Sequence, residues 1–359
     1  MANLDLDPYP NIKNRMLPRK NMKAAFAYAV SLALFTATGD TTAVPSTGTT
    51  SLRHEVQKKG ILIGSGAINP TYLNDTRFST VLAEQFNSLS PENELKWSEI
   101  EPTKGQYNWE TIDRLVDFAQ QNDMAVKGHG LISGAFNPDY LLDITDPTAL
   151  RDEMTSHFNA IMHRYQGKLD RWDVVTEVLK TNGSGLNPEN HFYKVLGPDF
   201  IADAFRTARA ADANAKLFFN ENLVEVQPGK RQELLELISG LLSVGVPIDG
   251  VALQMHITII PPAPGVITEM VNSYKALGLE VAIAEMDVHT YNTTQETQIY
   301  GNVIAEALSA GITDISFWGF TDAHAYTWLP GAQPLIFDAN YTAKNEFYAV
   351  HAALAQGGH

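Results

Sequence analysis

Residues 280–288 have the sequence EVAIAEMDV and residues 171–178 have the sequence RWDVVTEV, and these two stretches decide the fold. Each is a short apolar run, rich in β-branched residues, that carries acidic side chains near its carboxyl end. Apolar runs of this length are typical of strands buried on both faces, as in parallel sheets. Because the carboxyl ends of parallel strands converge on one side, the two stretches predict a parallel sheet with a polar site at its strand ends.

Six further runs of the same kind flank these two along the chain, and amphipathic segments separate them. The predicted strands are Ile61 to Ile68, Phe86 to Leu89, Met124 to Ile132, Arg171 to Val178, Ala215 to Asn220, Ile248 to Ile257, Glu280 to Val288 and Asp314 to Phe320. Helical spacing predicts helices over Trp109 to Asn122, Ala149 to Tyr165, Phe200 to Ala211, Gly229 to Leu242, Val266 to Leu277, Gln295 to Ala310 and Ala343 to Ala355. This alternation indicates repeated β-α units.

Eight such units predict an α/β fold with a single (β/α)8 barrel of the TIM type. The rival architecture is a doubly wound open sheet, which normally carries a glycine-rich phosphate loop after its first strand. Here the first strand contains Gly64 and Gly66 but lacks the third glycine and the helix start that this fingerprint requires. We therefore predict one barrel domain over residues 44–359.

The first 43 residues differ from the rest of the chain. Basic side chains precede an apolar run from Ala24 to Ala37, and small and polar residues follow as far as Ala43. This order predicts a secretory signal peptide over residues 1–43, and the apolar run is short for a bilayer span. An uncleaved anchor and a disordered tail are the alternatives. The prediction is a secreted, extracellular protein with no membrane attachment after cleavage.

Composition narrows the range of partners. The net charge of -15 disfavours nucleic acids and anionic membranes, which attract basic surfaces. The absence of cysteine excludes disulfides, thiolate catalysis and cysteine-ligated metals. With 44% hydrophobic and 19% charged residues, the chain has the composition of a globular protein. We predict a monomer that acts on a neutral or weakly charged partner.

Polar side chains recur at the ends of seven predicted strands. They are Glu92, Asn93, Lys96, His129, Glu177, Asn220, Glu221, Gln254, His256, Glu285, Asp287 and Trp318. Taken singly, each has an ordinary explanation, such as a surface carboxylate, a hydrogen-bonded core histidine or a core tryptophan. Burying an unpaired polar group costs roughly 2–7 kcal/mol, so a purely structural barrel has no reason to collect so many at one mouth. Their joint occurrence predicts a functional site.

Two carboxylates at one barrel mouth can cleave a glycosidic bond. One protonates the leaving oxygen while the other attacks the anomeric carbon, and in retaining enzymes they lie about 5–5.5 Å apart. We predict Glu177 as the general acid/base and Glu285 as the nucleophile, in settings that push their pKa values apart. His256 is predicted to hold the nucleophile ionised through a hydrogen bond, and Trp318 to form an apolar platform for a sugar face.

At these residues the chain resembles glycoside hydrolase family 10, best known for endo-β-1,4-xylanases, from about Leu52 to Leu354. The motifs that carry the resemblance are residues 91–97 (PENELKW), 128–129 (GH), 172–177 (WDVVTE), 254–256 (QMH), 283–287 (IAEMD) and 318–319 (WG), supported by 208–212 (ARAAD) and 334–338 (PLIFD). The resemblance implies a retaining double displacement with Glu177 and Glu285 in the roles given above. It implies a carbohydrate substrate, xylan above all, and no metal or organic cofactor for the chemistry.

The resemblance also implies which residues contact the sugar. The implied substrate-contacting positions are Glu92, Asn93, Lys96, His129, Thr176, Asn220, Gln254, His256, Trp318 and Tyr326. Two of them depart from the family pattern. Thr176 stands where the family usually has an asparagine that contacts the sugar 2-hydroxyl, and Tyr326 replaces a second active-site tryptophan, with Trp328 two residues on. After His129, residues 133–136 (SGAF) replace the usual Trp-His-Ser-Gln.

Three functions remain open on this evidence. The leading hypothesis is a secreted endo-1,4-β-xylanase. The second is a hydrolase of another β-glycoside, such as a plant saponin, because a threonine hydroxyl is shorter than a carboxamide and the contact to the 2-hydroxyl is put in doubt. The third is a catalytically weakened barrel that binds carbohydrate without turnover; the retention of Glu177 and Glu285 opposes it.

Overall fold

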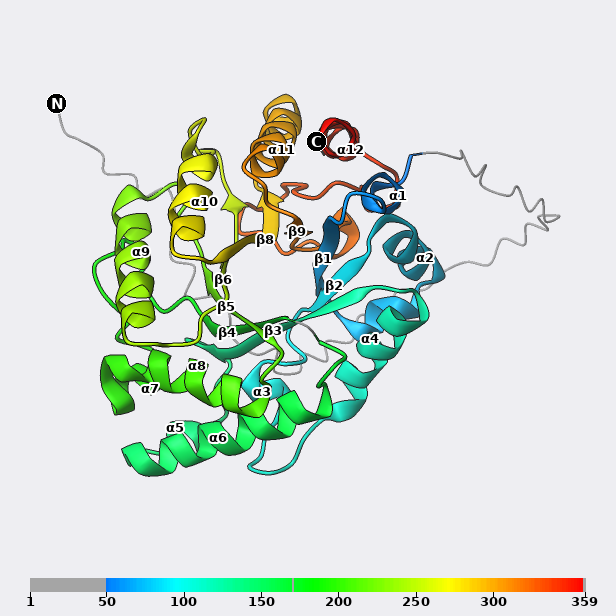
Figure 1. Cartoon of the computed structure of the whole chain (residues 1–359). Coiled ribbons are helices and arrows are strands. Elements are labelled where there is room, and N and C mark those ends of the chain that lie inside the picture. Colours follow the sequence, from blue (N-terminus) through cyan, green and yellow to red (C-terminus); the bar gives the residue numbers. More distant parts are fainter. Residues whose placement is uncertain (1–49, 170, 358–359) are drawn as a thin grey trace, which may run out of the picture. The chain divides into compact units, whose positions relative to one another are not determined.

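A closed ring of parallel strands forms the centre of the computed structural model, which describes residues 50–169 and 171–357. Hydrogen bonds join the strands in the order β6-β5-β4-β3-β2-β1-β9-β8, and a further pairing of β6 with β8 closes the ring. Figure 1 looks into this ring, with the helices outside it. The fold is a single (β/α)8 barrel, as predicted. The predicted signal segment, residues 1–43, lies outside the described residues.

All eight predicted strands are present, and the sixth is interrupted. The strands are β1 (Leu62–Ile68), β2 (Ser88–Pro91), β3 (Ala125–Ser133), β4 (Arg171–Thr176), β5 (Lys216–Glu221), β6 (Gly250–Leu253), β7 (His256–Ile257), β8 (Glu280–Val288) and β9 (Asp314–Phe317). The two pieces β6 and β7 together form the sixth strand of the barrel, since both pair in parallel with β8. Between them Met255 has a φ of 65°, a left-handed conformation that breaks the strand.

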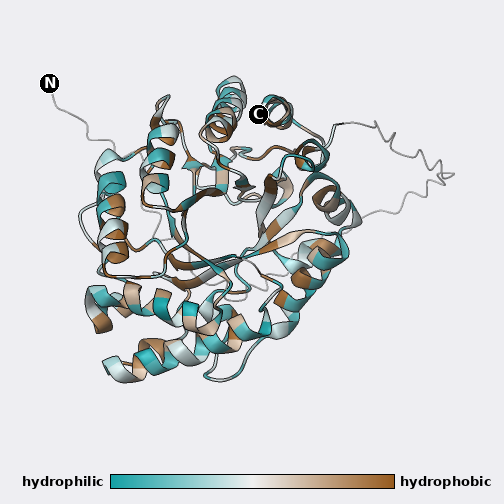
Figure 2. Ribbon diagram, viewed as in Figure 1, coloured by the Kyte–Doolittle hydropathy of each residue, from teal (hydrophilic) through white to brown (hydrophobic). Residues whose placement is uncertain are grey.

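The seven predicted helices are also present, together with several that the sequence pattern did not indicate. The helices are α1 (Leu52–Val56), α2 (Thr76–Gln85), α3 (Trp97–Ile100), α4 (Trp109–Gln121), α5 (Asp139–Leu142), α6 (Pro147–Arg164), α7 (His191–Leu196), α8 (Phe200–Ala211), α9 (Pro228–Ser243), α10 (Val266–Ala276), α11 (Thr293–Ser309) and α12 (Asn345–Gln356), with 3-10 turns at Pro70–Asn74, Gly197–Asp199 and Asp322–His324. The helices carry both hydrophobic and hydrophilic residues (Figure 2). Within the described ranges, no helix combines the length and the apolarity that crossing a membrane requires.

Helix α2 was not predicted because only two of its ten side chains, Phe78 and Leu82, are buried. Its start is set instead by Asp75, whose carboxylate accepts a hydrogen bond from the backbone N–H of Arg77 at 2.8 Å. Such a side-chain cap satisfies one of the free N–H groups of the first turn. A weak apolar stripe with a good cap is thus enough for a helix that completes a β-α unit.

Ionic and apolar layers fill the amino-terminal part of the barrel. Lys127 of β3 and Arg171 of β4 both pair with Asp314, the first residue of β9. Lys127 also donates a hydrogen bond to Ser316 at 2.7 Å. Burial lowers the pKa of Lys127 to about 8 against the opposing effect of Asp314. A small apolar cluster also lies within the sheet, made of Phe218, Ala252, Ala282 and Ala284.

Gly128 shows how closely the strands pack. A Cβ atom added there would lie 2.2 Å from Cε3 of Trp172, the directly opposed residue of β4. Trp172 is 1% exposed, so its ring has no room to move. Only glycine fits at residue 128, and this close approach holds β3 and β4 in the register that places His129 opposite Asp173.

Candidate active site

The predicted site residues gather at the carboxyl ends of the strands. His129 lies in β3, Asn220 in β5, His256 in β7 and Glu285 in β8. Glu177 directly follows β4 and has a φ of 55°, a conformation uncommon for a residue with a side chain. Such outliers concentrate at functional sites, because the surrounding structure must hold them in place.

Glu285 lies at the centre of this group and is 4% exposed. Asn220 donates a hydrogen bond from Nδ2 to Oε1 of Glu285 at 2.8 Å, and Nε2 of His256 lies 3.3 Å from Oε2. On the third side, Nδ1 of His129 lies 3.7 Å from Oε1. Burial alone raises the pKa of Glu285, but His129, His256 and Asn220 outweigh it and hold the pKa below its usual value. Glu285 is therefore ionised at neutral pH.

Two amides connect Glu285 to Glu177. Nε2 of Gln254 donates to Oε1 of Glu177 at 3.1 Å and to Oδ1 of Asn220 at 2.8 Å. Nδ2 of Asn220 in turn donates to Glu285 and, at 3.0 Å, to Oδ2 of Asp173. Both hydrogens of each amide are used, so their orientations are fixed by the network. The two glutamates predicted for catalysis thus belong to one connected set of side chains.

His256 is held by a second carboxylate. Its Nδ1 lies 2.9 Å from Oδ1 of Asp287, which is 1% exposed. Burial lowers the pKa of His256, yet Asp287 and Glu285 raise it well above its usual value. For Asp287, burial raises the pKa, and His256 and His289 lower it below the usual range. His256 is thus a buried cation between two anions.

A basic and aromatic group lies beside the two glutamates. Lys96 donates from Nζ to Oδ1 of Asn93 at 2.9 Å, and its ammonium lies 4.3 Å from the ring centre of Phe136 and 5.9 Å from that of Trp318. Burial lowers the pKa of Lys96, while Glu285, Glu177 and Glu92 oppose this shift. In the segment 133–136, which replaces the family's usual Trp-His-Ser-Gln, the ring of Phe136 therefore packs against Lys96.

Thr176 has an unusual setting for a predicted sugar-contacting residue. It is 5% exposed, and its hydroxyl has no hydrogen-bond partner among the described residues. The hydroxyl lies against Gly130, where an added Cβ atom would be 2.7 Å from Oγ1. The side chain is thus buried against β3.

Tyr326 lies at the edge of the group. It is 41% exposed and contacts Trp328, whose ring centre is 6.1 Å away. Trp328 lies closer to the centre, with its ring perpendicular to that of His256 at 5.5 Å. Trp318 likewise makes edge contacts with His129 at 5.3 Å and His256 at 6.3 Å. The structure therefore brings Trp318 into the central group. Tyr326 lies farther out and is connected to this group through Trp328.

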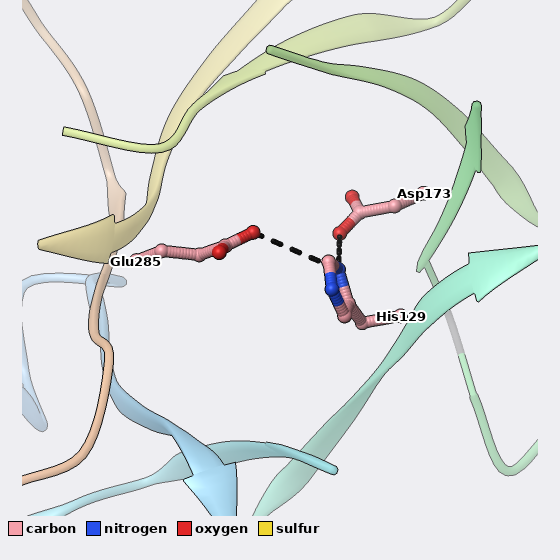
Figure 3. A group of neighbouring side chains, drawn as sticks. All are labelled: His129, Asp173 and Glu285. Atoms are coloured by element: carbon pink, nitrogen blue, oxygen red, sulfur yellow. Dashed lines mark hydrogen bonds and ion pairs between the residues drawn. The ribbon is translucent and has the colours of Figure 1, made fainter. Parts of the chain in front are cut away.

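Among the described residues, His129, Asp173 and Glu285 form a cluster of metal-ligating types, with one atom of each within 4.8 Å of the others (Figure 3). Nδ1 of His129 lies 2.9 Å from Oδ2 of Asp173, and this same oxygen accepts the bond from Asn220. The cluster's atoms are engaged with one another, and the geometry is that of a hydrogen-bonded network.

Two central residues, Asp173 and His289, were not among the predicted site residues, and Asp287 had no predicted role. Asp173 is 2% exposed, and its pKa is raised by burial but lowered further by Arg171 and His129 to below its usual value. The available signal was an acidic residue inside a continuous apolar strand, since buried carboxylates are retained only with partners. His289 gave no comparable signal, because its partner Thr327 lies 38 residues away.

A (β/α)8 barrel that joins two glutamates from different strands in one buried polar network has the architecture of a glycoside hydrolase. Comparison with protein families identifies which one. The family model for "Glycosyl hydrolase family 10" matches residues 51–353. The chain belongs to glycosyl hydrolase family 10, whose members act with retention of configuration.

Curated relatives resemble most of the chain. "Endo-1,4-beta-xylanase 3" of Hypocrea jecorina is 32% identical over 301 residues, which cover 84% of this chain and 84% of that protein. "Beta-1,4-xylanase" of Dictyoglomus thermophilum is 32% identical over 320 residues, covering 82% of this chain and 89% of the relative. Among solved structures, xylanase 10B from Thermotoga petrophila in complex with xylobiose matches with a TM-score of 0.81 and 31% identity, covering 86% of this chain and 98% of the other.

Proposed function

We propose that this glycoside hydrolase is a secreted endo-1,4-β-xylanase in which Glu285 attacks the anomeric carbon and Glu177 acts as general acid and then general base. The names of the relatives support the substrate. The observation that carries the assignment of the nucleophile is the setting of Glu285, a buried carboxylate that three neighbouring side chains keep ionised. An attacking carboxylate must be free of its proton before the substrate arrives.

Glu177 fits the complementary role. It is half-buried, and one oxygen of its carboxylate accepts a hydrogen bond from Gln254. In the first step it would protonate the departing glycosidic oxygen while the bond from Glu285 to the anomeric carbon forms. In the second step the Glu177 carboxylate would take a proton from water, which attacks the same carbon and releases Glu285.

Matched variants test both roles. We expect Glu285→Gln to abolish release of reducing sugar from xylan and turnover of an aryl β-xylobioside. Glu177→Gln should lose about 10²–10⁴-fold on xylan but much less on an aryl glycoside with an acidic leaving group, which needs no protonation to depart. Glu189→Gln, an exposed glutamate in the segment after β4, is the control and should leave both rates unchanged.

A mechanism-based 2-fluoro xyloside provides an independent readout. It should add one sugar mass to the peptide that contains Glu285, because it slows the second step and lets the glycosyl-enzyme accumulate. Equal background sugar release by wild type and Glu285→Gln would refute the xylanase proposal. Oligosaccharide binding by calorimetry without turnover over days would favour a carbohydrate-binding barrel in its place.

A second candidate is the hydrolysis of another β-glycoside whose leaving group is apolar, such as a saponin. Two observations favour it. The Thr176 hydroxyl is buried against Gly130 and does not extend as an asparagine carboxamide would. In addition, Ile259 and Ile260 are 60% and 48% exposed in the loop that follows β7, separated from Ile257 by Thr258.

A substrate panel separates the two candidates. Product analysis by mass spectrometry after incubation with xylan, xylo-oligosaccharides, aryl glycosides and saponin glycosides identifies the preferred class. If Ile259 and Ile260 bind the leaving group, replacing both by serine should lower kcat/KM for saponins. The kcat/KM for xylo-oligosaccharides should stay unchanged. Unchanged rates on all substrates would remove the argument for this candidate.

Secretion and monomeric state are further parts of the proposal. The order of basic, apolar and small residues before Ala43 supports export. Amino-terminal sequencing of protein recovered from culture medium would locate the cleavage, and retention of the intact chain in the cells would contradict export. Light scattering on the purified protein would give its oligomeric state, with a monomer expected.

A further inference from the structure

His289 is a buried titratable residue that none of the proposed catalytic steps uses. It directly follows β8 and is 1% exposed. Its Nε2 lies 3.1 Å from Oδ2 of Asp287, and its Nδ1 lies 3.0 Å from the hydroxyl of Thr327. One face of its ring is covered by Trp328, with ring centres 3.7 Å apart. Two of these neighbours, Asp287 and Trp328, also contact His256, which in turn contacts Glu285.

The first chain of contacts runs through Asp287. One oxygen of this carboxylate faces Nδ1 of His256 and the other faces Nε2 of His289. The Asp287 contact with His289 is out of line for an ideal hydrogen bond but is at ion-pair distance. A ring edge this close to the carboxylate restrains its position, so Asp287 is held between His289 and His256.

The second chain of contacts runs to the segment 326–330, which connects the 3-10 turn after β9 to the rest of the barrel. The Thr327 hydroxyl faces His289 and also lies 2.9 Å from the carbonyl of Leu329. The Trp328 ring lies flat on His289 and perpendicular to His256. The Tyr291 hydroxyl donates to the carbonyl of Pro330 at 2.8 Å. Residues directly after β8 therefore hold this segment at three points.

We propose that His289 is a positioning residue for the active site: through Asp287 it holds His256 against Glu285, and through Thr327 and Trp328 it fixes the segment that carries Tyr326. The proposal rests on the proposed function of Glu285 as nucleophile. It assigns the two ring nitrogens to different tasks. Nε2 serves the chemical step, and Nδ1 serves the placement of the substrate-facing segment.

Other titratable groups near Glu285, His256 and Asp287 also influence the pH dependence of activity. The titratable groups that face Glu285, His256 and Asp287 come from several elements and are Lys96, His129, Glu177, Glu225, Tyr300 and His289. All of them except His289 itself remain in place when His289 alone is replaced. A shift in the pH profile of such a variant therefore reports on the Asp287 contact.

Two conservative substitutions separate the tasks of the two nitrogens. The amide of glutamine reaches about as far as Nε2 of histidine, and that of asparagine about as far as Nδ1. His289→Asn keeps a hydrogen-bonding amide beside Thr327 and removes the nitrogen that faces Asp287, while His289→Gln does the reverse. We expect His289→Asn to lower kcat on an aryl glycoside by roughly 10- to 100-fold, the effect of losing one close contact with a charged group.

His289→Asn should also move the acid limb of kcat/KM to higher pH. A less firmly held His256 stabilises the Glu285 carboxylate less, so the pKa of Glu285 rises and the nucleophile is protonated sooner as pH falls. His289→Gln should keep this limb and kcat, and should raise KM for oligosaccharides. Thr327→Val should show the same rise in KM, because it removes the same contact.

The outcomes divide clearly. An unmoved acid limb in His289→Asn, or equal losses of kcat and thermal stability in both histidine variants, would reduce His289 to a packing residue and overturn the proposal. Failure of the proposed function is a different result, namely no turnover by wild type or full activity in Glu285→Gln. In that case ring nitrogen NMR of 15N-histidine protein still tests the contact, because His289→Asn should shift the His256 signals and His289→Gln should not.

Discussion

The replacement Asn220→Ala tests the electrostatic account of the site most directly. Asn220 is fully buried, and its Nδ2 donates to both Glu285 and Asp173. Alanine removes both donors without adding charge or bulk. The remaining neighbours of Glu285, His129 and His256, stay in place. The substitution therefore isolates what one amide contributes to keeping Glu285 ionised.

The magnitude follows from the hydrogen bond that is lost. A hydrogen bond to a charged group contributes about 1.5–3 kcal/mol, and one pKa unit corresponds to about 1.4 kcal/mol. Loss of the Asn220 bond should therefore raise the pKa of Glu285 by about 1–2 units. The sign is upward because a donor stabilises only the carboxylate form. The nucleophile must be ionised, so activity should be lost earlier as the pH is lowered.

The assay is the pH dependence of kcat/KM on an aryl β-glycoside, whose acid limb reports ionisation in the free enzyme. Asn190→Ala is the matched control, because Asn190 is also buried and only caps α7 by accepting from the N–H of Tyr193. Both variants should be less stable to urea, but only Asn220→Ala should move the acid limb. An acid limb that coincides with that of wild type would refute the reasoning, whatever the loss of stability.

Three further predictions concern stability. Lys230→Met leaves the buried carboxylate of Glu221, 2.8 Å from Nζ in the wild type, without its counter-ion and should cost about 3–5 kcal/mol in urea unfolding; a wild-type midpoint would contradict this. Burial raises the pKa of Glu296 to about 8, so its favourable contribution is complete below the unfolded value and disappears as pH rises through about 8. Glu296→Gln should therefore flatten the fall in stability between pH 5 and pH 8, and an equally steep fall would count against this. Gly128→Ala drives a Cβ atom into Trp172 and should cost about 1–3 kcal/mol or prevent folding, measured by thermal melting.

The barrel could be predicted from sequence because its strands are short and buried on both faces. The predicted bounds of β8 are the observed ones, since a clear break precedes Glu280 and another follows Val288. It merged β6 and β7 into one strand, because Met255 is apolar and nothing in its side chain signals a left-handed backbone. Helix α2 was not predicted because few of its residues are buried, which leaves only a weak apolar pattern.

Most residues of the candidate site could be predicted from the sequence, but the hydrogen bonds between them could not. Glu177 and Glu285 were selected because each lies late in a predicted apolar strand, and the fold then dictates that they face one mouth. The hydrogen bonds by which Asn220 and Gln254 link the two glutamates could not be inferred, because the orientation of each amide depends on atoms contributed by three strands. His289 was missed because its partners, Asp287 and Thr327, lie on different elements and acquire meaning only in space.

Some polar groups of the site make all their hydrogen bonds within the protein and others do not. This difference indicates which part of the site is rigid before substrate binds. Asn220 and Gln254 use all their donors within the protein, so substrate need not reorganise them. The hydroxyl of Thr176, in contrast, is buried at the end of β4 without a hydrogen-bond partner among the described residues, as is Nε1 of Trp328. An unpaired buried hydroxyl costs about 1–3 kcal/mol. The hydrogen-bond network around Glu285 is thus set in advance, whereas Thr176, where this chain departs from the family pattern, keeps a hydroxyl without a partner.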